Sequence, residues 1–212
     1  MKLYSYWRST TSYRVRAALN LKGLAYETIP VDLTAGAQQA EDYVRLNPGK
    51  GVPTLVLDDG TVLTQSLAII DYLDAVFPSP RLIPEEPAQR ARVLAAAHTV
   101  ALDIHPVNNL RLIGQLKSRY GATPEQARDW MDHWMTEGFN ALEPQLSDTS
   151  TFSFGEAPDL ADLCLVAQVY NAHRWGVDLS PFPKITRVEQ ACLGLPEIAA
   201  AHPDQQPDAI GS

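Results

Sequence analysis

The chain of 212 residues is poor in cysteine and has no long hydrophobic run. Only Cys164 and Cys192 are present, with no CxxC pair, so the composition excludes a disulfide scaffold. Both cysteines stand among apolar residues in helix-like patterns, and we expect buried, inert thiols. No stretch approaches the roughly 18 uncharged apolar residues of a membrane-spanning helix. We therefore expect a globular protein that crosses no membrane, with 45% hydrophobic residues to build a core.

The patterns of a targeting segment and of a metal site are also missing. The first eight residues, MKLYSYWR, hold no apolar run of signal-peptide length, so we expect a cytoplasmic protein. The five histidines include no HExxH motif and no pair at i, i+4. His98 and His105 could share a helix face, but two lone imidazoles do not make a metal site. We predict no structural metal.

Basic residues are outnumbered, 17 against 25 acidic residues, which gives a formal net charge of −8. This balance argues against a general nucleic-acid binder. The basic residues that precede the first acidic residue are Lys2, Arg8, Arg14, Arg16 and Lys22. A small basic pocket on an acidic protein suits a small anionic ligand, because the local field matters more than the net charge. The alternative is a solvated helix face, which we favour for Lys2 and Lys22. Arg14 and Arg16 fall inside a helical pattern and are interpreted as structural or surface charges.

The first eighty residues alternate strand and helix signals. Strands are predicted at residues 2–6, 26–31, 54–57 and 61–64, and helices at residues 12–23, 38–46 and 67–76. Ser12 is the expected cap of the first helix, Gly23 ends it, and Ser66 opens the third. The sequence Asp-Asp-Gly at residues 58–60 predicts a hairpin. The order β-α-β-α-β-β-α describes a compact sheet with helices on its faces.

A proline-rich stretch at residues 78–87 predicts a stiff linker, and beyond it the strand signals vanish. Long helical patterns follow at about 88–118, 125–146, 160–175 and 185–193. Asp159 and Asp162 resemble a capping box in which carboxylates replace the usual hydroxyl and glutamate. We predict an α/β domain over residues 1–80, followed by an all-α domain over residues 88–212.

Three features of the first domain suit an anion. Arg8 is followed by a run of hydroxyl side chains ahead of a helix, where free backbone N–H groups attract negative charge. A simple capping cluster explains this run equally well. A cis peptide between Val52 and Pro53 would expose the backbone groups of Val52, although cis is the minority state. Gln65 and Ser66 begin another helix, where the Ser66 hydroxyl either holds a carboxylate or only caps the helix.

Several segments along the chain match, in order, the motifs of one enzyme family. They are residues 9–19 (STTSYRVRAAL), 21–23 (LKG), 46–48 (LNP), 52–55 (VPTL), 65–73 (QSLAIIDYL), 103–110 (DIHPVNNL) and 177–183 (VDLSPFP). These segments resemble zeta-class glutathione transferases, and together they span nearly the whole chain. The resemblance implies a thioredoxin-like first domain, an all-helical second domain and a homodimer.

The resemblance also implies a glutathione site. Gln65 and Ser66 match the pair that holds the γ-glutamyl carboxylate, and Val52 matches the backbone partner of the cysteinyl unit. Ser9 matches the hydroxyl nearest the thiol. The other matched positions are Thr10, Thr11, Gln38, His105 and Asn109, the last two in the second domain.

Thr11 departs from the family pattern, because many zeta enzymes have a cysteine there. A threonine forms no covalent adduct, so a mechanism that needs a protein thiol at this position is excluded. Isomerisation survives the change, because the attacking sulfur belongs to glutathione. Together with residues 103–106 (DIHP), the threonine favours a likeness to bacterial maleylpyruvate isomerases over animal maleylacetoacetate isomerases.

The implied activity is a glutathione-dependent cis–trans isomerisation. It would convert a maleyl dicarboxylate, maleylpyruvate or maleylacetoacetate, to its fumaryl isomer in aromatic-compound catabolism. Ser9, Thr11 and Arg8 are the candidate catalytic residues. Arg8, Arg111 and Arg174 are candidate clamps for the carboxylates of the substrate. For Arg174 the alternative is an ordinary cation at a helix end.

Three other functions are weighed against this one. A transferase that conjugates or dehalogenates small α-halo acids would use the same thiolate, and it is the main alternative. A non-catalytic interaction module is opposed by the joint presence of Ser9, Gln65 and Ser66. A thiol-disulfide oxidoreductase is disfavoured, because the turn before the first helix has no cysteine.

Overall fold

The computed structural model describes residues 1–209. They divide into two compact units, made of residues 1–82 with 193–209 and of residues 83–192. The passage from one unit to the other falls inside the linker region expected from the sequence. The C-terminal segment differs from expectation, because residues 193–209 pack with the first unit and not with the helical one. The last three residues of the predicted second domain, 210–212, lie outside the described residues.

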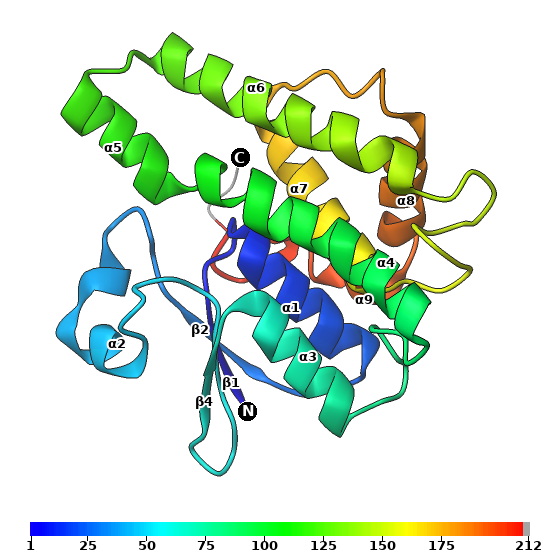
Figure 1. The fold of residues 1–212 in the computed structure, drawn as a ribbon. Helices are drawn as coiled ribbons and strands as arrows, with labels where there is room; N and C mark the ends of the chain where they lie inside the picture. The colour runs from blue at the N-terminus through cyan, green and yellow to red at the C-terminus, as the bar shows by residue number, and fades with distance from the viewer. Residues whose placement is uncertain (210–212) are drawn as a thin grey trace. The chain divides into compact units, whose positions relative to one another are not determined.

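The first unit is built on a four-stranded sheet with the order β2-β1-β3-β4 (Figure 1). Its strands are β1 (Lys2–Ser5), β2 (Glu27–Pro30), β3 (Thr54–Val56) and β4 (Val62–Thr64). β1 and β2 are parallel, whereas β3 is antiparallel to both β1 and β4. Each strand lies within its predicted range, and the turn at residues 58–60 closes the predicted β3–β4 hairpin.

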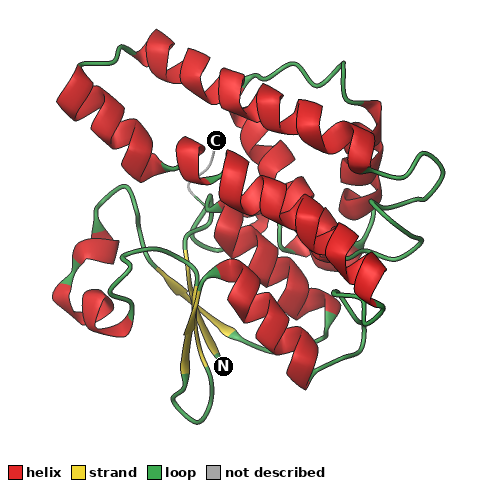
Figure 2. Ribbon diagram, viewed as in Figure 1, coloured by secondary structure: helices red, strands yellow, loops and turns green. Residues whose placement is uncertain are grey.

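Helices lie on both sides of this sheet, with α1 and α3 on one side and α2 on the other (Figure 2). The helices of the unit are α1 (Thr10–Leu21), α2 (Glu41–Leu46), α3 (Ser66–Val76) and α9 (Pro196–Ala200). α1 packs against both α3 and α9. Leu3, Leu19, Leu55 and Ile70 are fully buried where the sheet meets these helices. The unit has the thioredoxin-like fold that the sequence predicted.

The start of α1 is set by Ser9, so the prediction that Ser12 caps this helix is wrong. Ser9 has an extended backbone, and its hydroxyl accepts a hydrogen bond from the N–H of Ser12 at 3.2 Å. Ser12 is fully buried, because it lies inside the helix on a packed face. The end of α1 is as predicted, with Gly23 at φ +64° just beyond the last turn.

Lys22 is buried at the end of α1, so its interpretation as a solvated charge is wrong. Its ammonium forms an ion pair with Asp74 of α3 at 2.9 Å and donates to the backbone oxygens of Phe77 and Pro80. Three acceptors therefore match the three protons of the ammonium, which makes the burial tolerable. Lys2, by contrast, is exposed, as predicted.

In the described part of the second unit, every regular element is helical. The elements are α4 (Pro87–His98), a π-helical segment (Thr99–Ile104), a 3₁₀ turn (Pro106–Asn108), α5 (Leu110–Tyr120), α6 (Pro124–Leu142), a second 3₁₀ turn (Glu143–Gln145), α7 (Leu160–Trp175) and α8 (Pro183–Leu193). α7 is almost entirely buried and forms the centre of this core. Cys164 and Cys192 are free and buried, as predicted. Burial raises the pKa of the Cys192 thiol well above its ordinary value, which keeps it protonated and inert.

The start of α7 is the predicted capping box. The N–H of Asp159 donates to the Asp162 carboxylate at 2.7 Å, and the N–H of Ala161 donates to the Asp159 carboxylate at 2.8 Å. Asp162 also accepts from the N–H of Ser153 at 2.8 Å, so the same carboxylate ties the preceding loop to the helix. Two carboxylates thus occupy one buried helix start.

The single helix predicted over residues 88–118 is wrong, because the chain breaks into α4, the π-helical segment and α5. Pro106 has no N–H to continue the helical pattern, and the Asn109 side chain accepts from the N–H of Leu112 at 3.0 Å to begin α5 anew. The π-helical segment packs closely on α6. A Cβ on Gly138 of α6 would lie 2.1 Å from a side-chain carbon of Ile104, so only glycine admits this contact.

Two general features complete the description of residues 1–209. None of their helices combines the length and the apolar character that crossing a membrane requires. Within the same residues, the His, Cys, Asp and Glu side chains form no group of three or more that could hold a metal ion.

Candidate active site

Ser9, Thr11 and Val52, which the sequence analysis assigned to one site, are joined by hydrogen bonds. The hydroxyls of Ser9 and Thr11 lie 2.9 Å apart, and the Thr11 hydroxyl donates to the backbone oxygen of Val52 at 2.8 Å. Ser9 and Thr11 stand at the N-terminal end of α1, whereas Val52 lies in the loop before β3. The packing of helix on sheet therefore brings together residues that are 41 positions apart.

Counting protons sets the direction of this hydrogen-bond chain. Each hydroxyl has one proton to donate, and that of Thr11 is directed at Val52. Ser9 is therefore the donor to Thr11, while its own oxygen accepts from the N–H of Ser12. The Ser9 hydroxyl is held in place by the helix cap and carries a proton that can turn towards a ligand.

The loop before β3 is held by two side chains that the sequence analysis did not single out. The peptide bond before Pro53 is cis, one of the two states that the sequence left open. The Tyr43 hydroxyl donates to the backbone oxygen of Gly51 and pairs with the Thr54 hydroxyl at 3.0 Å. The side-chain amide of Asn47 donates to the same two oxygens, each at 2.9 Å. Burial raises the pKa of Tyr43, so its hydroxyl remains a donor at neutral pH.

The start of α3 lacks a side-chain cap from the residue before it. Gln65 precedes the helix with φ +69°, a left-handed value that is uncommon for a residue with a side chain and is often found at functional sites. The Gln65 side chain makes no capping hydrogen bond, so within residues 1–209 it leaves the first N–H groups of α3 unpaired. Ser66 is buried as the first helical residue and does not cap the helix, contrary to the simpler alternative.

Arg14 of α1 is interpreted from the sequence as a structural or surface charge, and its burial beside this site excludes the surface alternative. It is 1% exposed, and one guanidinium nitrogen, Nη1, lies 3.5 Å from the Ser66 hydroxyl oxygen. Its Nε and Nη2 atoms are buried and have no hydrogen-bond partner among residues 1–209. Thr11 and Arg14 are three residues apart, so they share one face of α1. The Ser9–Thr11–Val52 chain and the Arg14–Ser66 contact therefore lie about one helical turn apart.

Arg16 holds the turn that precedes Ser9 in place through hydrogen bonds. Its guanidinium donates to the backbone oxygens of Trp7 at 3.1 Å and Ala201 at 3.0 Å, and to the Ser5 hydroxyl at 3.0 Å. The N–H of Trp7 in turn donates to the Asp208 carboxylate at 3.0 Å. The turn between β1 and Ser9 is thus fixed by a buried cation and by the C-terminal segment, as a structural role for Arg16 implies.

The other predicted site residues of the first unit have separate environments. The Arg8 guanidinium lies over the Trp7 ring, 4.9 Å from its centre, and one of its nitrogens is 3.5 Å from the Tyr6 hydroxyl. Thr10 is buried in the first turn of α1. Gln38 lies in a 3₁₀ turn before α2, and its side-chain oxygen is buried without a hydrogen-bond partner in residues 1–209.

The remaining predicted residues belong to the second unit. The Asn109 side chain makes two hydrogen bonds within it: its oxygen caps α5, and its nitrogen donates one proton to the backbone oxygen of Pro106 at 2.9 Å. His105 is half-buried beside the same turn, and Arg111 is exposed in the first turn of α5. Arg174, near the end of α7, is exposed and donates to the Asn171 side chain at 3.3 Å. The grouping of these residues with Ser9 and Ser66 stays a prediction.

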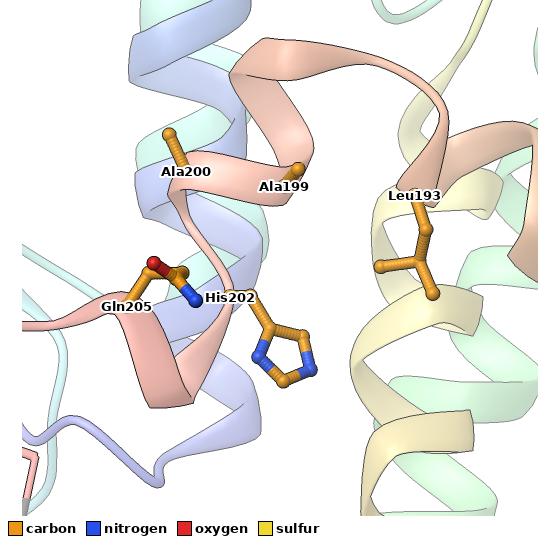
Figure 3. Close-up of a pocket in the computed structure, with 5 residues that line it drawn as sticks. All are labelled: Leu193, Ala199, Ala200, His202 and Gln205. Atoms are coloured by element: carbon orange, nitrogen blue, oxygen red, sulfur yellow. The ribbon is translucent and has the colours of Figure 1, made fainter.

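A pocket of about 320 Å³ lies elsewhere in the first unit, around α9 (Figure 3). It is lined by Leu193, Ala199, Ala200, His202 and Gln205, none of which the sequence analysis assigned to a site. The His202 ring turns into the space beside Leu193, but its Nδ1 accepts from the N–H of Asp204 at 3.3 Å. This lining offers no set of groups for an anion.

The ends of α1 and α3 are therefore the better candidate. They offer a hydroxyl proton that can turn, two positive helix ends and a buried guanidinium that has no carboxylate partner among residues 1–209. Such a set favours a ligand that carries both an ionisable thiol and a carboxylate, because the hydroxyl can stabilise a thiolate and the cation a carboxylate.

Comparisons with known proteins agree with this chemistry. Residues 8–76 match the family described as glutathione S-transferase, N-terminal domain. The first unit, with its thioredoxin-like sheet and its hydroxyl at the start of α1, is the N-terminal domain of a glutathione transferase.

Relatives that match this chain over nearly its whole length show to which class within that family it is similar. The chain is 45% identical over 210 residues to a probable maleylacetoacetate isomerase of Vibrio cholerae, which covers 98% of this chain and 97% of that protein. A solved holo structure of a maleyl pyruvate isomerase, a bacterial zeta-class glutathione transferase, superposes with a TM-score of 0.96 at 42% identity and covers 99% and 100% of the two chains. A maleylacetoacetate isomerase of Methylobacterium extorquens AM1, solved with malonate and GSH bound, has a TM-score of 0.96 at 40% identity and covers both chains completely.

The chain belongs to the maleylacetoacetate and maleylpyruvate isomerase family, the zeta class of glutathione transferases. The family, the fold and the enzyme class that the sequence predicted, a glutathione-dependent cis–trans isomerase, are confirmed.

Proposed function

We propose that this chain binds glutathione at the start of α1 and α3 and uses it to convert a maleyl dicarboxylate to its fumaryl isomer. The observation that carries the proposal is the hydroxyl chain from Ser9 through Thr11 to Val52, which lies one helical turn from the Arg14–Ser66 contact. Buried polar atoms of Arg14 and Gln38 that have no partner among residues 1–209 support the fit of a polar ligand.

Each part of glutathione has a counterpart in this arrangement. Ser66 and the unpaired N–H groups of α3 would receive the γ-glutamyl carboxylate, with Gln65 beside them. The backbone of Val52 would pair with the cysteinyl unit. Thr10, Thr11 and Gln38 complete the proposed contacts in the first unit, and the family resemblance adds His105 and Asn109 from the second.

When bound, glutathione supplies a thiolate that adds reversibly to the maleyl double bond, so that the bond becomes single, rotates and re-forms as the fumaryl isomer. A thiol with a pKa of about 8.5 is only a few per cent ionised at neutral pH. Ser9 would lower this pKa by turning its proton from Thr11 to the sulfur, and the positive end of α1 acts in the same direction.

Thr11 forms no covalent bond with the substrate. It controls how readily the Ser9 proton reaches the sulfur. While Ser9 donates to Thr11, its proton is withheld from the sulfur, and turning it costs one hydrogen bond of about 1 kcal/mol. The bond from Thr11 to Val52 is independent of this turn and keeps the loop before β3 in place.

Arginine side chains are the proposed binding partners of the substrate's carboxylates. Negative charge develops on the substrate while its double bond is opened, so guanidinium groups nearby speed this step as well as binding. Arg8 stands next to Ser9 in the chain, and within residues 1–209 its one hydrogen bond is a weak one to the Tyr6 hydroxyl at 3.5 Å. Arg111 and Arg174, both exposed, are the further candidates.

The homodimer implied by the resemblance and the cytoplasmic location expected from the sequence are part of this proposal. Sedimentation of the purified chain tests the first, and cell fractionation tests the second.

The decisive experiment is an absorbance assay on maleylpyruvate and maleylacetoacetate with glutathione far below the substrate concentration. We expect complete conversion to the fumaryl isomer with glutathione recovered unchanged, and the ratio of kcat/KM values identifies the preferred substrate. Glutathione consumed one per turnover on α-halo acids, with neither maleyl substrate converted, would overturn the proposal in favour of conjugation.

A further inference from the structure

We infer that Arg14 is the buried counter-cation of the glutathione site, one that recognises the γ-glutamyl carboxylate through the hydroxyl of Ser66. The inference rests on the proposed glutathione site and adds a binding residue to it. The sequence pattern gives no hint of this role, because Arg14 falls in the middle of a helix.

The first observation is that Arg14 has no compensating charge. It is 1% exposed, no ion pair joins it to a carboxylate in residues 1–209, and its Nε and Nη2 have no acceptor there. A buried guanidinium in this state is costly, because both its charge and its N–H groups have lost water. A structural arginine would be expected to have its acceptors built in.

Two neighbouring cations show what built-in acceptors look like. Arg16 is fully buried on the same helix, but it donates to backbone oxygens of Tyr6, Trp7 and Ala201 and to the Ser5 hydroxyl. Lys22 pairs with a carboxylate and two backbone oxygens. These two buried cations therefore have hydrogen-bond acceptors within the first unit, whereas Nε and Nη2 of Arg14 have none in residues 1–209.

The second observation is the direction of the contact with Ser66. The Nη1 group of Arg14 donates to the Ser66 oxygen, so the Ser66 proton is free to point elsewhere. The start of α3 is not capped by the Gln65 side chain, and its first turn contains no acidic residue. A carboxylate at this helix end would accept from the Ser66 hydroxyl and from backbone N–H groups, with the guanidinium behind them.

Such a chain strengthens each of its hydrogen bonds, because the cation polarises the hydroxyl that faces the carboxylate. Water could satisfy the N–H groups of Arg14, but it would not compensate the charge. The chemistry that fits is therefore a carboxylate, and glutathione carries one on its γ-glutamyl unit.

The test is the variant Arg14→Met, which keeps an unbranched apolar side chain, shorter than that of arginine, and removes the charge. We expect the dissociation constant of glutathione, measured by calorimetry without substrate, to rise about 10- to 100-fold, the effect of one charge-assisted contact. The melting temperature without ligand should stay equal or rise, since an uncompensated buried charge is gone. The matched control, Arg16→Met, should instead lower the melting temperature.

A glutathione analogue with a carboxamide in place of the γ-glutamyl α-carboxylate identifies the recognised group. The natural chain should bind glutathione much more tightly than this analogue, and Arg14→Met should bind the two about equally. Arg14→Lys, which restores a charge without the planar fork, should recover part of the preference.

The outcomes separate this inference from the proposed function. If the natural chain binds no glutathione, the proposed function fails. If it binds glutathione and Arg14→Met keeps both the affinity and the preference over the analogue, only the role of Arg14 fails. A loss of affinity that follows a change of oligomeric state in sedimentation, or a fall in melting temperature as large as that of Arg16→Met, would also overturn it by showing a structural role.

Discussion

At the scale of single residues, the Ser9 hydroxyl has one observed task, the helix cap, and one task that we propose, the stabilisation of a thiolate. It caps α1 by accepting from the N–H of Ser12, and its proton is available for a thiolate after it turns from Thr11. The two tasks use different parts of the hydroxyl, since the cap needs a lone pair and the thiolate needs the proton. Substitutions can therefore separate stability from activity.

Replacing Ser9 with alanine should lower kcat about 100-fold, the effect of losing one activating donor. The ionisation of bound glutathione, followed by the ultraviolet absorbance of the thiolate, should move to higher pH. Loss of the cap should also cost about 1 kcal/mol of unfolding free energy, so kinetics are measured well below the melting temperature. Ser9→Thr, which keeps cap and hydroxyl, is the control. Lower stability with unchanged kcat and ionisation would leave Ser9 only a structural role.

Replacing Thr11 with valine, which has nearly the same shape, removes the acceptor that holds the Ser9 proton. We expect the thiolate of bound glutathione to form at the same or lower pH, because Ser9 no longer has a competing partner. Turnover should fall less than about tenfold, the effect of one lost positioning hydrogen bond to Val52. A loss as large as that of Ser9→Ala would contradict this view and give Thr11 a direct role in the chemistry.

At the scale of elements, local pattern predicts which segments are helices and strands, but contacts between elements decide where they begin. The four strands and α1 to α3 follow from alternation, turn residues and caps. The π-helical segment, which interrupts the helix predicted over residues 88–118, places Ile104 against Gly138 on another helix. Such a contact between distant segments leaves no periodic signal in either one.

The variant Gly138→Ala tests this contact. In an ordinary helix this change would stabilise the protein by up to about 1 kcal/mol, but here the new Cβ would meet Ile104 side-chain carbons at 2.1 and 2.3 Å. We expect a loss of about 1–3 kcal/mol in denaturant unfolding, typical of overpacking. In a chain that already carries Ile104→Ala, adding Gly138→Ala should cost much less unfolding free energy than it costs in the natural chain. Simple additivity of the two changes would show that the contact does not constrain the π-helical segment.

At the scale of the whole molecule, motif order identified the family, the fold and most of the proposed site. What it missed depends on burial, which a linear pattern does not record. Arg14 and Lys22 look like ordinary helical charges in the sequence, yet both are buried, one with its charge uncompensated and one paired. Residues 193–209 follow the last predicted helix and fall in the predicted helical domain, but they pack with the first unit, where Ala201 and Asp208 support the turn before Ser9. Such partners become visible only when distant segments meet.

The pH dependence of stability also belongs to the whole molecule, and the raised pKa of Asp159 contributes to it between about pH 4 and pH 8. Burial, followed by the charge of Asp162, raises the pKa of Asp159 from 3.8 to about 8. The pKa of Asp162 is raised as well, with burial as the largest cause. The folded chain therefore keeps a proton on Asp159 at pH values where the unfolded chain has lost it. Stability from this group is fully present below about pH 4 and declines as the pH rises towards 8.

The melting temperature should accordingly fall between pH 6 and pH 8. Asp159→Thr keeps an oxygen that can accept from the N–H groups at the start of α7 but carries no charge, so this variant should lose most of the decline and be the more stable protein at pH 8. Asp178→Asn is the control, because hydrogen bonds from Ser180 lower the pKa of Asp178, and its titration affects stability only at acidic pH. A decline that is the same in the natural chain and in Asp159→Thr would assign the pH dependence to other groups and show that the carboxylate pair at α7 is ionised without cost.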